Sequence, residues 1–255
     1  MRYFSRELVR GFKSLNFWIA CLLCLAFFMF SFWYNRFTIE NAHGYYLFYS
    51  VLFFGAVALL PVFAPIIAAL PFSQSYLQDK DHHFLWGVMN RMTPQQYWRT
   101  KMLVTGILGA LVLMLPLFLW LLINLVFLKN NKVPDLMTVA GPFSSLYNTR
   151  PLLFCLLLIG HSGLFGFIYA DLALVVSLYI EKTYAVIAIP FLAYLLPSFV
   201  FPYLGLSRFE PTMTFIINLD PGSTYLTVYG GLLFVGALTS TLLVAKIRKA
   251  EQWLS

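Results

Sequence analysis

The chain has 255 residues, of which 60% are hydrophobic and only 11% are charged. A soluble domain carries about a quarter charged residues, and a fold of this length cannot hide so much apolar surface from water, so the composition excludes an ordinary soluble protein and indicates an integral membrane protein. The net charge of +7 fits basic residues at the cytoplasmic ends of membrane helices. No basic run with interleaved polar residues suggests a nucleic-acid partner.

The first segment, residues 1–16, predicts an interfacial helix that lies flat on the lipid bilayer. Apolar and basic residues alternate at helical spacing, so one face is apolar and the other is cationic. The apolar stripe contains Phe4, Leu8, Phe12 and Leu15, and the basic stripe contains Arg2, Arg6, Arg10 and Lys13. A disordered basic leader is the alternative interpretation.

Six continuous apolar runs predict six transmembrane helices, because they are too long for the short alternating strands of a membrane barrel. The runs cover residues 17–34, 46–70, 102–128, 151–180, 185–204 and 225–245. With this layout, twelve Lys and Arg residues lie on the side of the two termini and five lie on the other side. The positive-inside rule therefore places both termini in the cytoplasm, in a multi-pass protein of the plasma (inner) membrane. The fold class is all-α, with residues 1–255 forming one transmembrane domain.

The longest predicted cytoplasmic segment covers residues 72–101. Its charged residues are followed by apolar ones, in the order Asp79, Lys80, Asp81, His82, His83, Phe84, Leu85, Val88 and Met89. This order is typical of a short helix with one polar and one apolar face, which could dock into a groove on a soluble partner. An ordinary connecting loop is the alternative. His82 and His83 point in different directions on a helix, so a metal site is not expected.

A second helix is predicted to begin at Pro94 and to run into the third span. Thr93 is a favourable N-cap, Pro94 suits the first helical position, and Gln96 completes a capping box. The cytoplasmic segment is therefore expected to be a short helix, a sharp turn and a new helix.

The predicted outer segment, residues 207–224, has an apolar stretch that is too short to span the bilayer. Two interpretations stay open: a re-entrant or surface helix that caps the outer end of a pathway, and a loop folded over its neighbours. We expect the re-entrant form.

The fourth span contains Asp171 and His161, which are candidate pathway residues because ionisable groups inside a membrane usually face protein or water. Their separation of ten residues is about 15 Å along a helix, so they cannot share a proton directly. Ser162, Gly166 and Ala170 recur every four residues on the same span. Such small residues predict a close helix contact, within the chain or across a dimer.

Motifs for catalysis are missing from the sequence. There is no P-loop, no H-E-x-x-H and no G-x-S-x-G. We therefore expect no enzymatic active site, no metal and no cofactor bound by this chain.

One stretch of the cytoplasmic segment, together with the whole layout, resembles the membrane subunit of type-two ABC exporters. The stretch reads Tyr76-Leu-Gln-Asp79-Lys80, then Phe84-Leu-Trp-Gly, then Asn90-Arg91-Met-Thr93-Pro94-Gln-Gln-Tyr97, then Lys101. In that family an acidic-basic pair precedes a short coupling helix, a turn, a Tyr and a Lys that opens the third span. This sequence has Asp79 where the family usually has Glu.

The resemblance implies a permease subunit that works as a pair, with a second copy or a sister permease, above two separate ATPase subunits that bind ATP and Mg. It implies export of a hydrophobic or amphipathic substrate such as a peptide, drug or lipid. It also implies that Phe84, Leu85 and Val88 fill a groove on the ATPase, while Lys80 and Arg91 pair with its acids. The implied coupling residues are Asp79, Lys80, Phe84, Leu85, Val88, Arg91, Thr93, Pro94 and Tyr97.

Two other functions stay open. An ion- or proton-coupled secondary transporter would use Asp171 as its proton site. A non-transporting membrane sensor or scaffold subunit would still use the docking segment.

Overall fold

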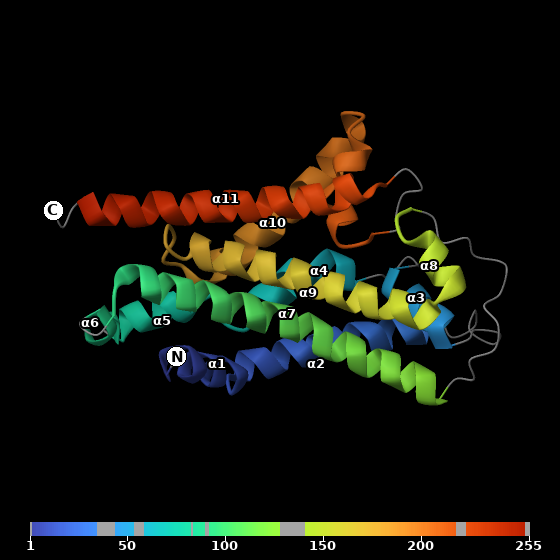
Figure 1. The fold of residues 1–255 in the computed structure, drawn as a ribbon, viewed down its shortest axis with the longest axis horizontal. Helices are drawn as coiled ribbons and strands as arrows, with labels where there is room; N and C mark the ends of the chain where they lie inside the picture. The colour runs from blue at the N-terminus through green and yellow to red at the C-terminus, as the bar shows by residue number, and fades with distance from the viewer. Residues whose placement is uncertain are drawn as a thin grey trace.

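The computed structural model describes residues 2–34, 44–53, 59–82, 84–89, 92–127, 141–217 and 223–252. Over these residues the regular secondary structure is helical, without any strand. Figure 1 shows an elongated bundle whose long helices run roughly along one axis. The predicted all-α fold class is therefore confirmed for the described part of the chain.

Five helices of the described chain are long and apolar enough to cross a membrane. They are α2 (Leu15–Tyr34), α7 (Pro94–Phe127), α9 (Pro151–Val176), α10 (Thr183–Tyr203) and α11 (Tyr225–Gln252). Large apolar side chains cover the outward faces of these helices. A surface of this kind is stable in lipid but not in water. The architecture is that of a multi-pass helical membrane protein.

The second predicted span falls on two shorter helices, α3 (Gly44–Phe53) and α4 (Leu59–Ala69). Neither is long enough to cross a bilayer alone, and residues 54–58 lie outside the described residues. In Figure 1, α3 lies at the end of the bundle opposite α5, with α4 between them. A sixth membrane crossing stays a prediction.

Both chain ends lie at one end of the bundle, next to the short helices α5 (Ser75–Asp81) and α6 (Phe84–Met89). The first helix, α1 (Arg2–Phe12), precedes α2 there, as the apolar and basic stripes predict. The helix α8 (Ser144–Thr149) lies at the opposite end. We call the end that holds α1, α5 and α6 the basal end.

The closest helix contact joins α7 and α9 through glycine. A Cβ atom added at Gly109 would lie 2.6 Å from the carbonyl oxygen of Gly166, which is closer than real Cβ contacts come. Ala170 packs against Gly109 as well, and Ser162 is buried on the same helix. The predicted small-residue face is therefore confirmed, and its contact lies within the chain.

The outer segment forms two short 3-10 turns, η2 (Ser207–Phe209) and η3 (Pro211–Thr214), rather than one helix. Its apolar residues turn inward, so Phe215 is buried with its ring 4.9 Å from that of Phe165. This matches the alternative interpretation, a loop folded over neighbouring helices. Residues 218–222 lie outside the described residues, and entry into the membrane stays a prediction.

Candidate functional site

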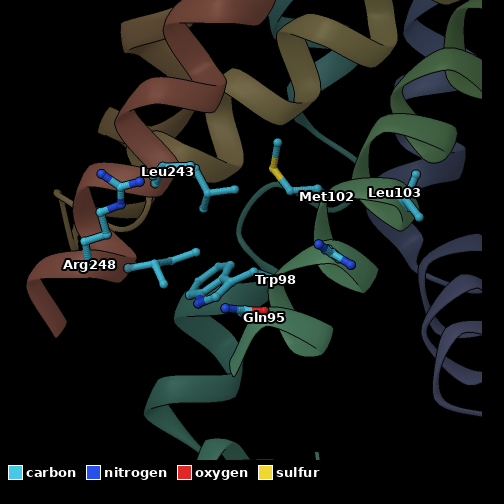
Figure 2. A pocket seen from close by; sticks show the side chains of 9 residues that line it. Gln95, Trp98, Met102, Leu103, Leu243 and Arg248 are labelled. Carbon is cyan, nitrogen blue, oxygen red and sulfur yellow. The ribbon is translucent and has the colours of Figure 1, made fainter. Parts of the chain in front are cut away.

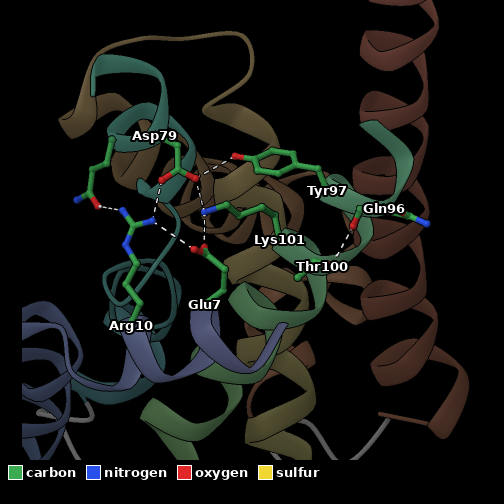
Figure 3. A network of polar contacts seen from close by, with 8 residues as sticks. Glu7, Arg10, Asp79, Gln96, Tyr97, Thr100 and Lys101 are labelled. Carbon is green, nitrogen blue, oxygen red and sulfur yellow. Dashed lines mark hydrogen bonds and ion pairs between the residues drawn. The ribbon is translucent and has the colours of Figure 1, made fainter. Parts of the chain in front are cut away.

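A cluster of charged side chains lies where α1, α5 and the start of α7 meet (Figure 3). Glu7 on α1, Asp79 on α5 and Lys101 on α7 are almost fully buried, and Arg10 on α1 is partly exposed. Charged side chains are seldom buried unless they are paired. We call these four residues and Tyr97 the charge cluster.

Lys101 is the centre of the cluster, and its side chain is 0% exposed. Its Nζ atom lies 2.5 Å from Glu7 Oε2 and 2.6 Å from Asp79 Oδ2. Arg10 donates from Nη1 to Asp79 Oδ1 at 2.7 Å and lies 3.4 Å from Glu7 Oε1. Two acids thus face two bases, and the charges of the cluster sum to zero.

Neutral groups complete the cluster. The Tyr97 hydroxyl donates to Asp79 Oδ2 at 3.1 Å, so each carboxylate oxygen of Asp79 accepts at least one hydrogen bond. Phe72 offers its ring to both cations, with Lys101 Nζ 5.0 Å and Arg10 Cζ 5.9 Å from the ring centre. Burial lowers the pKa of Arg10, but its hydrogen bond to Asp79 and the charges of both acids raise that pKa above its ordinary value.

Local sequence explains why these side chains converge. Glu7 and Arg10 are three residues apart, so they share one face of α1, and Tyr97 and Lys101 are four apart on α7. The predicted capping box fixes where α7 begins: the Gln96 N–H donates to Thr93 Oγ1 at 3.3 Å, and the Thr93 N–H donates to Gln96 Oε1 at 3.4 Å.

The apolar residues of the predicted coupling helix have different environments. Phe84 is 48% exposed at the basal end, whereas Val88 is 7% exposed and packs inside the chain with Tyr97 and Trp98. The expectation that Val88 fills a partner groove is therefore corrected: it supports α6 from within. The side chain of Leu85 and all of Arg91 lie outside the described residues.

Lys80 forms its ion pair within the chain. Its partner within the chain is Glu181, on the connection between α9 and α10. An ion pair between Lys80 and an acid on another protein stays a prediction. The hydrogen bond between them raises the pKa of Lys80 and lowers the pKa of Glu181. Both side chains are well exposed, so the pair contributes little to stability.

A pocket of about 310 Å³ opens beside the charge cluster. Its wall includes Glu7, Arg10 and Asp79 of the charge cluster. The remaining lining residues are Arg6 of α1, Gln78 of α5, His82 just after α5, and the Phe84 ring. A protruding side chain of a partner could enter here and meet both an apolar ring and hydrogen-bond donors.

The two pathway candidates on α9 are not brought together. His161 is buried, and its Nε2 atom lies 2.8 Å from the Thr214 carbonyl oxygen, so it ties α9 to η3. Asp171 is 5% exposed, and its Oδ1 atom has no hydrogen-bond partner in the described part of the chain. Among the same residues, no group of three or more His, Cys, Asp or Glu could hold a metal ion.

The sequence analysis missed Glu7 and assigned Arg10 to the basic stripe of α1 rather than to a buried ion pair. A signal was present, because Glu7 lies three residues after Phe4 and one before Leu8, on the apolar side of α1. A buried acid at such a position needs a buried base. The sequence does not show that this base is Lys101, because α1 and α7 meet only through tertiary packing.

Comparisons with protein-family models, curated proteins and solved structures found no match for this chain. What the site can do is therefore argued from its geometry. The charge cluster ties α1, α5 and α7 together with buried ion pairs, and α6 adds an exposed aromatic ring beside a polar pocket. The site thus links three helices at the basal end and presents one aromatic ring outward.

Proposed function

We propose that this chain is the permease subunit of an ATP-driven ABC exporter of type two. It works with separate ATPase subunits, which bind ATP and Mg, and with a second copy or a sister permease. The pair moves a hydrophobic or amphipathic substrate out of the cell. The basal end is cytoplasmic in this proposal, and α5 and α6 form the coupling segment.

The observation that carries the proposal is the charge cluster. Asp79 on the coupling segment is held by Arg10 of α1 and by Lys101 of α7. A push on α5 therefore moves α1 and the base of α7 as well. Because α7 is one continuous helix of 34 residues, about 50 Å long at 1.5 Å per residue, a tilt at its base reaches the opposite end of the bundle.

The docking surface is the pocket beside the cluster together with Phe84. Aromatic residues, Phe among them, are enriched at protein interfaces, and Phe84 is about half exposed. The two acids on the pocket wall, Glu7 and Asp79, already pair with Arg10 and Lys101. Arg6, which lines the same wall, therefore favours a partner segment with a carboxylate or carbonyl oxygen near an apolar side chain. In this proposal Phe84 binds the ATPase, and Val88 and Tyr97 hold α6 in place.

The first test is co-purification of the tagged chain from native membranes, followed by mass spectrometry. A stoichiometric ATPase with a P-loop is expected. Phe84→Asp should reduce its recovery at least tenfold, whereas Tyr184→Asp, which changes an exposed aromatic at the start of α10, should not. Absence of any ATPase under mild detergents and after cross-linking contradicts the proposal.

A second candidate is a proton-coupled transporter, and the unpaired Oδ1 atom of Asp171 favours it. A buried carboxyl with a free oxygen can take up and release a proton as its surroundings change. Asp171→Asn should then abolish transport while leaving any ATPase recovery unchanged. A sensor or scaffold subunit would instead recover the ATPase without any transport to lose.

A further inference from the structure

A second pocket, of about 610 Å³, lies between the start of α7 and the end of α11. Figure 2 shows Trp98 and Met102 on one side, and Leu243 and Arg248 on the other. The two helices reach it from opposite directions, one entering the bundle and one leaving it. It is separate from the charge cluster and from the pocket beside Phe84.

One end of this pocket is basic. Arg99 and Arg248 both line it, and Gln95 adds an amide, while no acid lines it. Both arginines are exposed. In the described residues neither forms an ion pair with an acid. Arg99 comes from α7 and Arg248 from α11, so each helix contributes one guanidinium group to the lining. Guanidinium groups bind the oxygens of a phosphate or carboxylate well.

The other end of the pocket is apolar. Met102 and Leu243 line it deeper along α7 and α11. Trp98 is 8% exposed and packs against Tyr76 with ring centres 5.0 Å apart, which makes a firm wall between the two ends. Along α7, eight residues separate Gln95 from Leu103, about 12 Å of helix. That length matches a lipid headgroup together with the first part of its acyl chains.

We propose that this pocket binds one anionic phospholipid of the leaflet at the basal end. Arg99 and Arg248 hold the phosphate, Gln95 donates to a headgroup oxygen, and the acyl chains run past Met102 and Leu243 into the bilayer. Anionic lipid is concentrated on the cytoplasmic side, which is where the basic residues place this end. A bound lipid would join α7 to α11. The proposal does not depend on the ATPase partner.

The test is native mass spectrometry of the purified full chain, titrated with phosphatidylglycerol or with phosphatidylcholine of the same acyl chains. We expect one phosphatidylglycerol to bind at least tenfold more tightly than phosphatidylcholine. The double variant Arg99→Gln/Arg248→Gln should remove that preference. The matched control, Lys182→Gln/Arg208→Gln, removes two exposed charges outside the pocket and should change affinity less than twofold.

Two further arms separate the possible occupants. Inorganic phosphate at millimolar concentration should not displace the lipid, because the apolar end of the pocket contributes to binding. Met102→Trp, which fills that end and keeps both arginines, should weaken phosphatidylglycerol binding while the protein stays monodisperse on gel filtration. The proposal is overturned if the control double variant loses the same preference for phosphatidylglycerol. It is also overturned if free phosphate displaces the lipid, or if the occupant proves to be a second copy of the chain.

Discussion

The charge cluster and the middle of α9 stabilise the same bundle by different means. At the basal end, Asp79 is 1% exposed and accepts from Arg10, Tyr97 and Lys101. In the middle of α9, contact with α7 rests on glycine, and Asp171 keeps an unpartnered Oδ1 atom. Two buried aspartates are therefore compensated to very different degrees. The ion pairs and hydrogen bonds of Asp79 hold its side chain in one position. Asp171, with one oxygen unpartnered, can instead exchange a proton or a binding partner.

The largest expected effect is at Lys101. Lys101→Met leaves Glu7 and Asp79 buried with one base fewer, and breaking a buried pair in this way costs about 3–5 kcal/mol. The thermal midpoint of the purified chain in detergent should fall strongly. Lys182→Met, at an exposed position on the same side, serves as the control. An unchanged midpoint in Lys101→Met would show that the cluster is not compensated as described.

Next comes the α7–α9 contact. Gly166→Ala places a methyl group against the Gly109 carbonyl oxygen, and overpacking of this kind costs about 1–3 kcal/mol. The matched control is Gly160→Ala on the same helix, where a Cβ atom meets nothing within 4 Å. The thermal midpoint should fall in Gly166→Ala and stay unchanged in Gly160→Ala. Equal midpoints for the two variants would contradict the close backbone contact between α7 and α9.

Neutralising Asp171 should have a smaller effect than neutralising Asp79. Asp79→Asn weakens ion pairs to two bases, so it should lower stability clearly. Asp171→Asn removes no hydrogen bond at Oδ1, and such bonds contribute about 0.5–1.5 kcal/mol each, so its midpoint should stay close to that of the parent chain. The comparison between the regions fails if Asp171→Asn destabilises as much as Asp79→Asn does.

The smallest effect belongs to the Lys80–Glu181 pair. Because the pKa of Glu181 is lowered in the fold, its contribution is present above the ordinary Glu value of about 4.3 and is lost as pH falls through the folded value. The pKa of Lys80 is raised, so its contribution is present below the ordinary Lys value of about 10.4 and is lost as pH rises through the folded value. Glu181→Gln should therefore shift the midpoint slightly at pH 7 and less at pH 3, and added salt should reduce the shift. A shift of equal size at both pH values would point to packing rather than charge.

Most of the fold could be predicted from local signals. Long apolar runs gave α2, α7, α9, α10 and α11, the stripes gave α1, and the capping box gave the start of α7. The small residues of α9 predicted a close contact but not its partner. Gly109 becomes that partner through tertiary packing, which periodicity does not contain.

The site was only partly predictable. The cytoplasmic segment drew attention to Asp79 and Tyr97, yet both were expected to serve an outside partner rather than a buried network. Ion pairs between residues 69 to 94 positions apart depend on how α1 folds back onto α5 and α7. Burial decides their role, and burial is set by that long-range packing.

The most direct test of the central claim is whether α1 and α5 move as one unit. Spin labels at exposed Val9 and Asp81, one on each helix, can be measured by pulsed electron spin resonance in the complex with its co-purified ATPase, with and without trapped ATP. A second pair, at Asp81 and exposed Leu206 near the outer end of α10, measures the distance between the two ends of the bundle. The account predicts a constant distance for the first pair and a changed distance for the second. A first-pair distance that changes on ATP binding would contradict it.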